Sequence, residues 1–381
     1  MVMMCFHFFS LGPLYISECA PKHLRGSLTT LFNLAVVGGQ VFASVICGLF
    51  SYLPASYNWR LMLAFGAIPA LIQMVGFMTL PYSPSWLVIK NRKDEAKQVL
   101  RDIRQEPPTP EGQEDPVVTE LNEIVEEHET AKEGEHVTLW KLWTTNPPVR
   151  RAMILGCSLW AVSQLAGINT IMYYGAVIIR KAGFDGNRSF DIWITVPLFT
   201  MQLIGILVCF KIIDLKGRRW TLLTSMSMVA TGLFVIAIGF VIGSGNLTAL
   251  AMCFYLFSFG LGLSTMPYTM NAEIYPTEFR GHCVAQSTAV FWLCNFVVSV
   301  TFLSLMRATS EAFTFFLYTG IVIASGIWFY FLVPETSGLS LHEIQALFEN
   351  GSNGKKATNN GDDDASDESS ELNNTPVPTY V

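Results

Sequence analysis

Several stretches of this sequence are long, apolar and free of charge, and they restrict the possible fold more than any other feature. Leu61–Ile89, Ala152–Ile179 and Trp220–Ala272 contain no Asp, Glu, Lys or Arg. A run of ~18 or more such residues can cross the ~30 Å hydrocarbon core of a bilayer. Backbone groups in lipid must hydrogen-bond within their own segment, so each run is predicted to be helical. The chain is therefore predicted to be an all-α polytopic membrane protein.

Hydropathy divides the chain into nine predicted transmembrane helices. The longest charge-free run holds two of them, because a turn at Gly243-Ser244-Gly245-Asn246 interrupts it. The predicted spans are 1–19, 27–52, 61–81, 152–179, 191–212, 220–242, 247–270, 284–306 and 312–333.

The distribution of basic residues predicts the orientation of these spans. If the loop after the first span is cytoplasmic, that side holds 19 of the 24 Lys and Arg residues. Cytoplasmic loops carry an excess of Lys and Arg, so the C-terminus is predicted to be cytoplasmic. The plasma membrane is the expected compartment.

Two segments outside the spans differ in composition. Loop 82–150 contains Asp94–Arg104 and Val117–Thr130, in which apolar residues recur at helical spacing among charges, so short amphipathic helices are predicted there. The tail from Gly351 is rich in Asn, Gly, Ser and Asp and is predicted to be disordered.

An internal repeat relates two parts of the chain. Glu18-x-x-Pro-x-x-x-Arg25-Gly follows the first span, and Glu273-x-x-Pro-x-x-x-Arg280-Gly follows the seventh with identical spacing. Pro81-Tyr-Ser-Pro-Ser85 follows the third span in the same register as Pro334-Glu-Thr-Ser-Gly338 after the ninth. Spans 1–3 and 7–9 are therefore interpreted as equivalent units of a duplicated protein. Counterparts of spans 4–6 are then expected before residue 1.

Charged residues at the ends of spans are interpreted as a cytoplasmic gate. A charge there is costly unless it is paired or reaches water, so simple anchoring at the interface is the alternative explanation. The repetition of Glu and Arg favours salt-bridge clusters that break in one state of an alternating-access carrier. The predicted gate residues are Glu18, Arg25, Asp214, Arg218, Arg219, Glu273, Arg280 and Glu335.

Polar residues in the middle of the spans predict a site for an uncharged solute. In span 4, Gly167 stands beside amides and hydroxyls, which is typical of a locally unwound helix. Amides donate and accept hydrogen bonds at once, which suits a solute with many hydroxyls, although such residues also join helices to each other. The predicted binding residues are Gln164, Asn169, Tyr173, Tyr174, Asn295, Tyr268, Asn33, Gln40 and Gln202.

Together these motifs resemble the sugar porter family of the major facilitator superfamily. The resemblance rests on Asp214-Leu-Lys-Gly-Arg-Arg219, Asn271-Ala-Glu273-Ile-Tyr-Pro276, Pro334-Glu-Thr336 and Gln164-Leu-Ala-Gly-Ile-Asn169. It covers about residues 1–350, from the family's fourth span to its twelfth. Within the family, Gly167–Tyr174 is most similar to the proton-coupled myo-inositol transporters.

The resemblance implies a major facilitator fold that lacks its first three spans. The implied parts are the second half of an N-terminal bundle (1–81), a cytoplasmic loop (82–150), a six-span C-terminal bundle (151–333) and a mostly disordered tail (334–381). It also implies a cyclic polyol as solute, with the family's coupling carboxylate in a span that this chain does not contain.

Some positions depart from the family pattern. Ser163 replaces a glutamine, Ala166 a serine, Tyr268 a tryptophan, Phe291 an amide and Gln202 an asparagine. Pro81-Tyr-Ser-Pro-Ser85 lacks the two charges of the corresponding gate motif.

The expected function is transport of a neutral cyclic polyol or sugar, with myo-inositol favoured, with or without proton coupling. A hexose carried by facilitated diffusion and a chain that is inactive in transport are the alternatives. No catalytic constellation, metal site, cofactor site or nucleic-acid partner is predicted. The expected partners are the solute, protons and the lipid bilayer.

Overall fold

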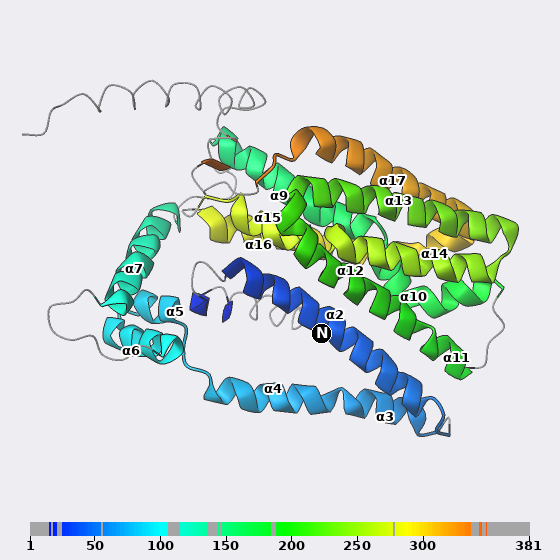
Figure 1. Ribbon diagram of the computed structural model, residues 1–381, viewed down its shortest axis with the longest axis horizontal. Helices are drawn as coiled ribbons and strands as arrows, with labels where there is room; N and C mark the ends of the chain where they lie inside the picture. The colour runs from blue at the N-terminus through cyan, green and yellow to red at the C-terminus, as the bar shows by residue number, and fades with distance from the viewer. Residues whose placement is uncertain are drawn as a thin grey trace, which may run out of the picture.

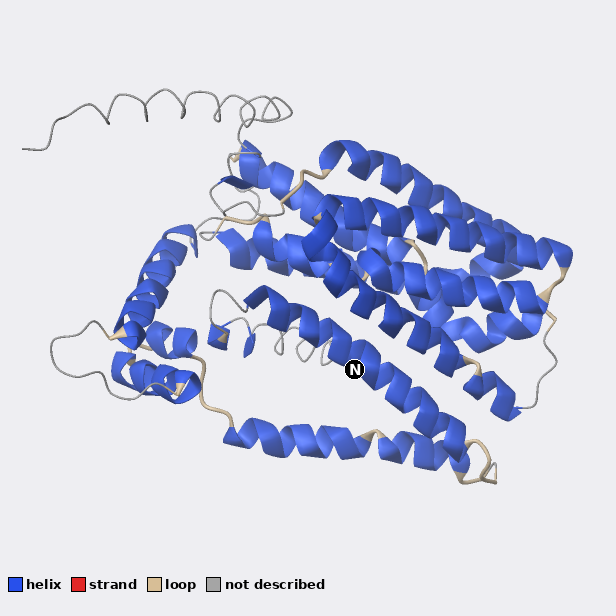
Figure 2. Ribbon diagram, in the orientation of Figure 1, coloured by secondary structure: helices blue, strands red, loops and turns tan. Residues whose placement is uncertain are grey.

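The computed structural model describes residues 15–16, 18–20, 25–54, 56–105, 115–135, 143–144, 146–183, 188–276, 279–336, 343–344 and 348. These residues form helices joined by short loops, with no strand among them (Figure 2). Eight helical segments of this described part are long and apolar enough to cross a membrane: Leu31–Phe50, Asn58–Thr79, Pro147–Lys181, Ser189–Ile213, Arg218–Ile242, Gly245–Glu273, Arg280–Ala308 and Glu311–Leu332.

These eight segments coincide one by one with the second to ninth predicted spans, and the expected all-α membrane architecture is confirmed for them. The first predicted span, 1–19, lies almost entirely outside the described residues. The predicted turn between spans 6 and 7 is also found, because one helix ends at Ile242 and the next begins at Gly245. There the Ser244 hydroxyl accepts a hydrogen bond from the Leu247 N–H, which caps the second helix.

Six spans form one tightly packed bundle, called here the C-half (Figure 1). Its two most extensive helix contacts are those of α13 with α17 and with α14. Large side chains with almost no exposure, such as Leu155, Tyr255 and Phe315, fill its interior. The elements are α9 (Pro147–Leu165), α10 (Ile168–Lys181), α11 (Arg188–Trp193), α12 (Thr195–Lys216), α13 (Arg218–Ile242), α14 (Gly245–Ser258), the π-helix η1 (Phe259–Leu263), α15 (Met266–Glu273), α16 (Arg280–Ala308) and α17 (Glu311–Leu332).

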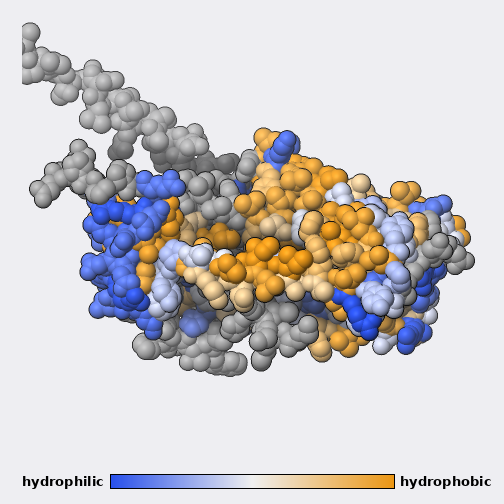
Figure 3. Space-filling model, turned by 90° about the horizontal axis from the view of Figure 1, so that it is seen from below, coloured by the Kyte–Doolittle hydropathy of each residue, from blue (hydrophilic) through white to orange (hydrophobic). Residues whose placement is uncertain are grey.

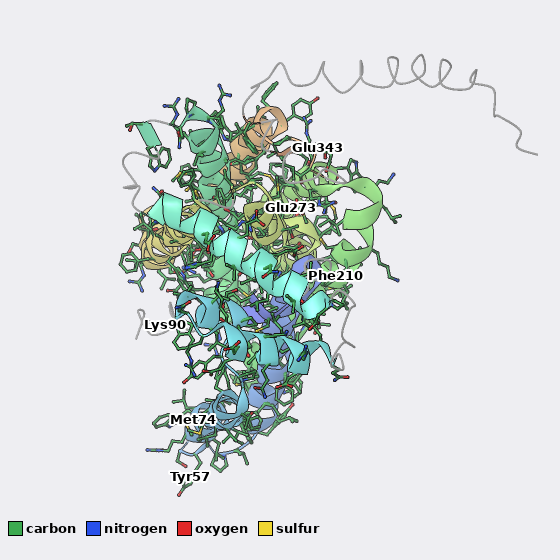
Figure 4. All side chains as sticks on the ribbon, turned by 90° about the vertical axis from the view of Figure 1, so that its left-hand side faces the viewer. Tyr57, Met74, Lys90, Phe210, Glu273 and Glu343 are labelled. Carbon is green, nitrogen blue, oxygen red and sulfur yellow. The ribbon has the colours of Figure 1, made fainter. Side chains whose placement is uncertain are left out.

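The helices before the C-half pack much less tightly. α2 (Arg25–Phe50) lies along α12 and α15, whereas α3 (Asn58–Phe65) and α4 (Ala67–Thr79) run apart from the C-half (Figure 1). Apart from Asn58 at its start, no residue of the span Asn58–Thr79 is buried inside the protein, and Figure 3 shows an apolar surface across the middle of the molecule. In Figure 4, Tyr57 and Met74 lie at the edge of the molecule farthest from Glu273.

α2 faces the C-half with small and polar side chains instead of bulky apolar ones. From Leu31 onward its buried residues are Asn33, Val37, Ser44 and Gly48, and their spacing places them on one face of the helix. At one end of this stripe a methyl group on Gly48 would come within 2.8 Å of the Trp193 ring. The interface between α2 and the C-half is therefore close and is formed mainly by small side chains of α2.

A three-helix unit lies at one end of the spans, consisting of α5 (Pro84–Ile89), α6 (Lys93–Arg104) and α7 (Pro116–Glu135) (Figure 1). Its small core contains Leu87, Leu100 and Val117. Arg104 joins α6 to α7 through two hydrogen bonds to the Glu120 carboxylate, at 2.6 and 3.1 Å. Helices α6 and α7 occupy the segments for which the sequence predicts amphipathic helices.

Close packing inside the C-half depends on glycine at the crossing of α12 and α14. A methyl group on Gly205 would lie only 2.2 Å from the carbonyl oxygen of Phe257. Gly320 in α17, in contrast, has open space where a methyl group would stand.

The substitution Gly205→Ala should destabilise the protein by ~1–3 kcal/mol, because the two backbones must move apart. Thermal unfolding of the purified chain in detergent should show a midpoint lower by several degrees. Gly320→Ala is the matched control, and its higher helix propensity should leave the midpoint unchanged or slightly raised. Equal midpoints for the Gly205→Ala and parent proteins would show that this crossing does not limit stability.

Candidate functional site

The span Pro147–Lys181 is broken in its middle, at Gly167. This residue has φ +83°, a left-handed conformation that glycine adopts without steric cost. The break separates α9 from α10. The Tyr255 hydroxyl donates to the Ala166 carbonyl (3.0 Å), and the Thr170 hydroxyl donates to the Gly167 carbonyl (2.6 Å). The unwound helix expected from the sequence is thus present and is stabilised by two hydroxyls.

Two amides lie on either side of this break and bond to each other. The Asn169 side chain donates to the Gln164 carbonyl oxygen at 2.5 Å, and the Gln164 amide donates to the Ser163 hydroxyl at 3.2 Å. Gln164 and Asn169 are 4% and 9% exposed, so both amides are buried inside the protein. Burying an amide is costly unless it is hydrogen-bonded, so the pair satisfies its own requirement. The hydroxyls of an uncharged solute could replace either of these two hydrogen bonds with a hydrogen bond to the solute.

The span Gly245–Glu273 is also irregular in its middle. Helix α14 passes into the π-helix η1, and α15 begins soon afterwards at Met266, with Pro267 in its first turn. The Ser225 hydroxyl accepts from the Leu263 N–H (2.9 Å) and donates to the Ser258 carbonyl (2.7 Å). Single-turn π-helices of this kind occur often at functional sites.

A hydrogen bond crosses from α2 to this second irregular region. The Asn33 amide nitrogen lies 3.2 Å from the hydroxyl oxygen and 3.5 Å from the carbonyl oxygen of Ser264. Two other predicted site residues, Gln40 and Gln202, have buried side-chain carbonyl oxygens that accept no hydrogen bond among the described residues. Buried polar atoms usually find a partner, so the two oxygens are free to accept one from a bound molecule or water.

Asn295 is linked to α10 through Ser299. The Ser299 hydroxyl donates to the Asn295 carbonyl oxygen (3.3 Å), and the Tyr174 hydroxyl donates to the Ser299 backbone carbonyl (3.3 Å). The neighbouring Tyr173 lies on another face of α10 and is 60% exposed. The structure therefore places Tyr174 against α16, one turn from Asn295, and leaves Tyr173 outside this contact.

Tyr268 belongs to an aromatic group that sequence analysis did not find. The Trp160 ring packs edge to face against the Tyr268 and Phe291 rings, at centroid distances of 4.6 and 4.8 Å. A tryptophan in an apolar span looks like any core residue, so only the structure identifies Trp160. Ser264 and Ser299 were missed for a similar reason, since serine is common in membrane helices.

Charged residues from three elements meet at the end of the spans nearest the three-helix unit. Arg218 forms an ion pair with Glu273 at 3.1 Å, and the Thr336 hydroxyl donates to the other Glu273 oxygen at 2.9 Å. The Glu335 carboxylate accepts from the backbone N–H groups of Arg218 and Arg219, at 2.9 and 3.2 Å. These residues are called the charge cluster below.

Glu335 occupies the N-terminus of α13, where unpaired N–H groups favour a carboxylate. Gly217 precedes this helix with φ +84°, and a methyl group there would lie 2.7 Å from the Glu335 carboxylate. Glycine is thus required both by the backbone conformation and by the approach of the carboxylate. Thr336 is a member of the cluster that the sequence did not identify, because its partner is distant in the chain.

The other predicted gate residues are placed differently. Arg219 donates through its side chain to the Tyr330 carbonyl at 2.6 Å, outside the Arg218–Glu273 pair. Arg280 begins α16 at the same end of the spans, and Glu18 is half-buried. The side chains of Arg25 and Asp214 lie outside the described residues, so pairing of Glu18 with Arg25 stays a prediction.

The Arg218–Glu273 pair should show energetic coupling in a double-mutant cycle made with Arg218→Gln and Glu273→Gln. Both side chains are less than a quarter exposed, so a coupling of ~1–2 kcal/mol in unfolding free energy is expected. The exposed pair Arg92–Glu95 is the matched control and should couple by less than ~0.5 kcal/mol. If the effects of the two substitutions were additive, the Arg218–Glu273 ion pair would not stabilise the contact between α13 and α15.

The chain resembles known proteins both in sequence and in structure. The family model described as "Sugar (and other) transporter" matches residues 7–348. A proton myo-inositol cotransporter of Caenorhabditis elegans is 30% identical over 95% of this chain and 75% of its own length. The proton myo-inositol cotransporter of Homo sapiens is 31% identical over 89% of this chain and 65% of its own length.

Among solved structures, the proton:xylose symporter XylE of the major facilitator superfamily, bound to 6-bromo-6-deoxy-D-glucose, superposes with a TM-score of 0.71 at 25% identity. This similarity covers 88% of the present chain and 70% of that chain. The chain therefore spans about two thirds to three quarters of the length of the proteins that it matches.

Proposed function

Because the chain belongs to the family of sugar and other transporters and is a multi-pass membrane protein with the major facilitator fold, we propose that it carries a neutral cyclic polyol or sugar by alternating access, with myo-inositol as the favoured solute. The two relatives described above are named for myo-inositol and the solved structure for xylose. These names support a small polyhydroxylated solute for this chain and favour the cyclitol.

The observation that carries the proposal is the buried amide pair at the break between α9 and α10. Gln164 and Asn169 together offer several donors and acceptors in a span whose middle holds no charge. Such a site matches hydroxyl groups and would leave an ionic solute without a counter-charge. The Asn295 amide adds a further polar group from α16, one turn after Phe291, whose ring contacts Trp160, one turn before Gln164.

Replacement of Gln164 by alanine should lower uptake of labelled myo-inositol by at least about tenfold. The change removes hydrogen bonds to the solute and leaves Asn169 unpaired, at ~1–3 kcal/mol for each lost partner. The measurement is counterflow by the purified full chain in liposomes, with D-xylose as a second solute. Gln73→Ala, on the exposed span Asn58–Thr79, is the matched control and should transport at the parent rate.

Two results would contradict the proposal in different ways. Parent-like uptake by the Gln164→Ala protein would refute the assignment of the site. Absence of uptake of either solute by the parent protein would refute the transport function. An inward proton gradient, imposed in the same vesicles, tests the proton coupling that the names of the relatives support. Coupling predicts a steady-state inositol level above that reached without the gradient, whereas equal levels would indicate facilitated diffusion.

We assign to the charge cluster the role of a latch at one end of the C-half. Opening an ion pair toward water costs only a few kcal/mol, so such a pair can break and reform during each transport cycle. Glu273→Gln should then change the maximal uptake rate and leave the half-saturating inositol concentration close to that of the parent. A change in half-saturation alone would place Glu273 in the solute site instead.

We further propose that the end with the charge cluster faces the cytoplasm and that the protein lies in the plasma membrane. The support is the charge asymmetry, since Lys211, Lys216, Arg218 and Arg219 all lie at that end. The sequon Asn187-Arg-Ser189 would then be outside and Asn373-Asn-Thr375 inside.

Glycosylation of these two sequons, among the four that the sequence contains, checks this orientation. In intact cells, Asn187→Gln should remove one glycan that endoglycosidase releases from the parent protein, and Asn373→Gln should remove none. Labelling by a membrane-impermeant biotin reagent should find the glycosylated form at the cell surface. A glycan on Asn373 would invert the proposed topology.

A further inference from the structure

Each of two site amides has an aromatic residue one helical turn before it. Trp160 precedes Gln164 on α9, and Phe291 precedes Asn295 on α16. Residues four positions apart lie on the same face of a helix, so each ring is next to its amide. The Trp160 and Phe291 rings are themselves in contact, with centroids 4.8 Å apart and planes at 73°.

A third ring completes this group. Tyr268, at the start of α15, packs edge to face against Trp160 at 4.6 Å and 85°. Trp160 is buried at 7% exposure, whereas Tyr268 and Phe291 are only half-buried. The three residues, called here the aromatic wall, join three helices of the C-half at one level. Part of the Tyr268 and Phe291 surface stays accessible.

The aromatic wall lies on the side of the amides that faces the charge cluster. Helices α9 and α16 run parallel, because the Trp143 ring nitrogen, just before α9, bonds to Gln286 (3.1 Å), and Trp160 near the end of α9 contacts Phe291 farther along α16 (4.8 Å). α16 begins beside the end of α15, whose last residue is Glu273 of the charge cluster. Residues one turn earlier on both helices are therefore nearer that cluster than the amides are.

This arrangement gives the proposed solute site two chemically different sides. The amide side can bond to hydroxyls, whereas aromatic rings offer a hydroxyl no comparable partner. A hydroxyl held against the wall would lose its hydrogen bonds to water, and a C–H or methyl group in its place would gain apolar contact.

We propose that the aromatic wall contacts one edge of the bound solute and makes the site selective for a cyclitol that carries an O-methyl group at that edge. The inference rests on the proposed function, since it assumes that Gln164 and Asn295 bind the opposite edge. Phe291 is its specificity-determining residue, because it is half-buried and stands one turn from Asn295. If the wall were only packing, changes in it would alter stability and leave the choice of solute unchanged.

The test is competition for binding of tritiated myo-inositol to the purified full chain in lipid nanodiscs. The competitors are unlabelled myo-inositol and each of its mono-O-methyl ethers. At least one ether should bind about tenfold more tightly than myo-inositol, which is the usual effect of a methyl group in an apolar pocket. This ratio is measured on the parent protein and needs no variant to fold.

Two substitutions at one position separate selectivity from packing. Phe291→Asn should lower the preference for the ether by about tenfold, because an amide at the wall favours the free hydroxyl. Phe291→Leu keeps an apolar surface and should retain the preference within about twofold. Phe296→Asn, at an exposed position of the same helix, is the matched control and should leave the ratio unchanged.

The outcomes distinguish this inference from the function on which it rests. If myo-inositol binds and no ether binds more tightly, or if Phe291→Asn leaves the ratio unchanged, the aromatic wall does not select the solute. If neither myo-inositol nor any of the ethers binds to the parent protein, the proposed function fails together with the inference.

Discussion

The structure depends on one constraint, which is that polar groups inside a membrane helix must find partners without help from bulk water. A regular helix meets this requirement by itself, but a broken helix does not. At Gly167 and at η1 the chain departs from regular α-helical geometry. The hydroxyls of Tyr255, Thr170 and Ser225 form hydrogen bonds with backbone groups at these breaks. Each break is thus stabilised by a hydroxyl from a neighbouring helix, Tyr255 at Gly167 and Ser225 at η1.

The same constraint explains why the proposed solute site lies at these breaks. Gln164 and Asn169 bond to each other in the absence of solute, so they are buried without a large penalty. The contact between Asn33 and Ser264 joins α2 to the second break, so the site region touches both halves of the chain. A solute that exchanges these bonds for its own would change how the halves are held together. The charge cluster likewise pairs polar groups of different helices, but it lies at the end of the spans, where water is available.

Much of this architecture could be predicted from the sequence, because membrane helices leave a strong local signal. Charge-free runs placed the eight described spans, and Gly167 among amides indicated the unwound helix. The polar side chains around it were harder to place, because their contacts depend on rotation about the helix axis. Tyr173 and Tyr174 are adjacent in sequence and about 100° apart around α10, so only Tyr174 meets α16.

Contacts made across the fold left no comparable signal. The sequence indicated a gate at Glu273 and Glu335 but not that Glu335 would bond to two backbone N–H groups at the start of α13. Thr336 and Ser264 could not be selected from many similar hydroxyl residues. The role of Trp160 could not be predicted from the sequence for the same reason. Its contacts with Tyr268 and Phe291 form only when α9, α15 and α16 pack together.

The central claim is that the amides at the break between α9 and α10 hold an uncharged polyhydroxylated solute. Cryo-electron microscopy of the full chain in lipid with saturating myo-inositol tests it most directly. The account predicts solute density within hydrogen-bond distance of Gln164 and Asn295, with the Gln164–Asn169 bond lengthened or exchanged. Solute density elsewhere, or amides that keep their mutual bond and face lipid while solute is bound, would contradict it.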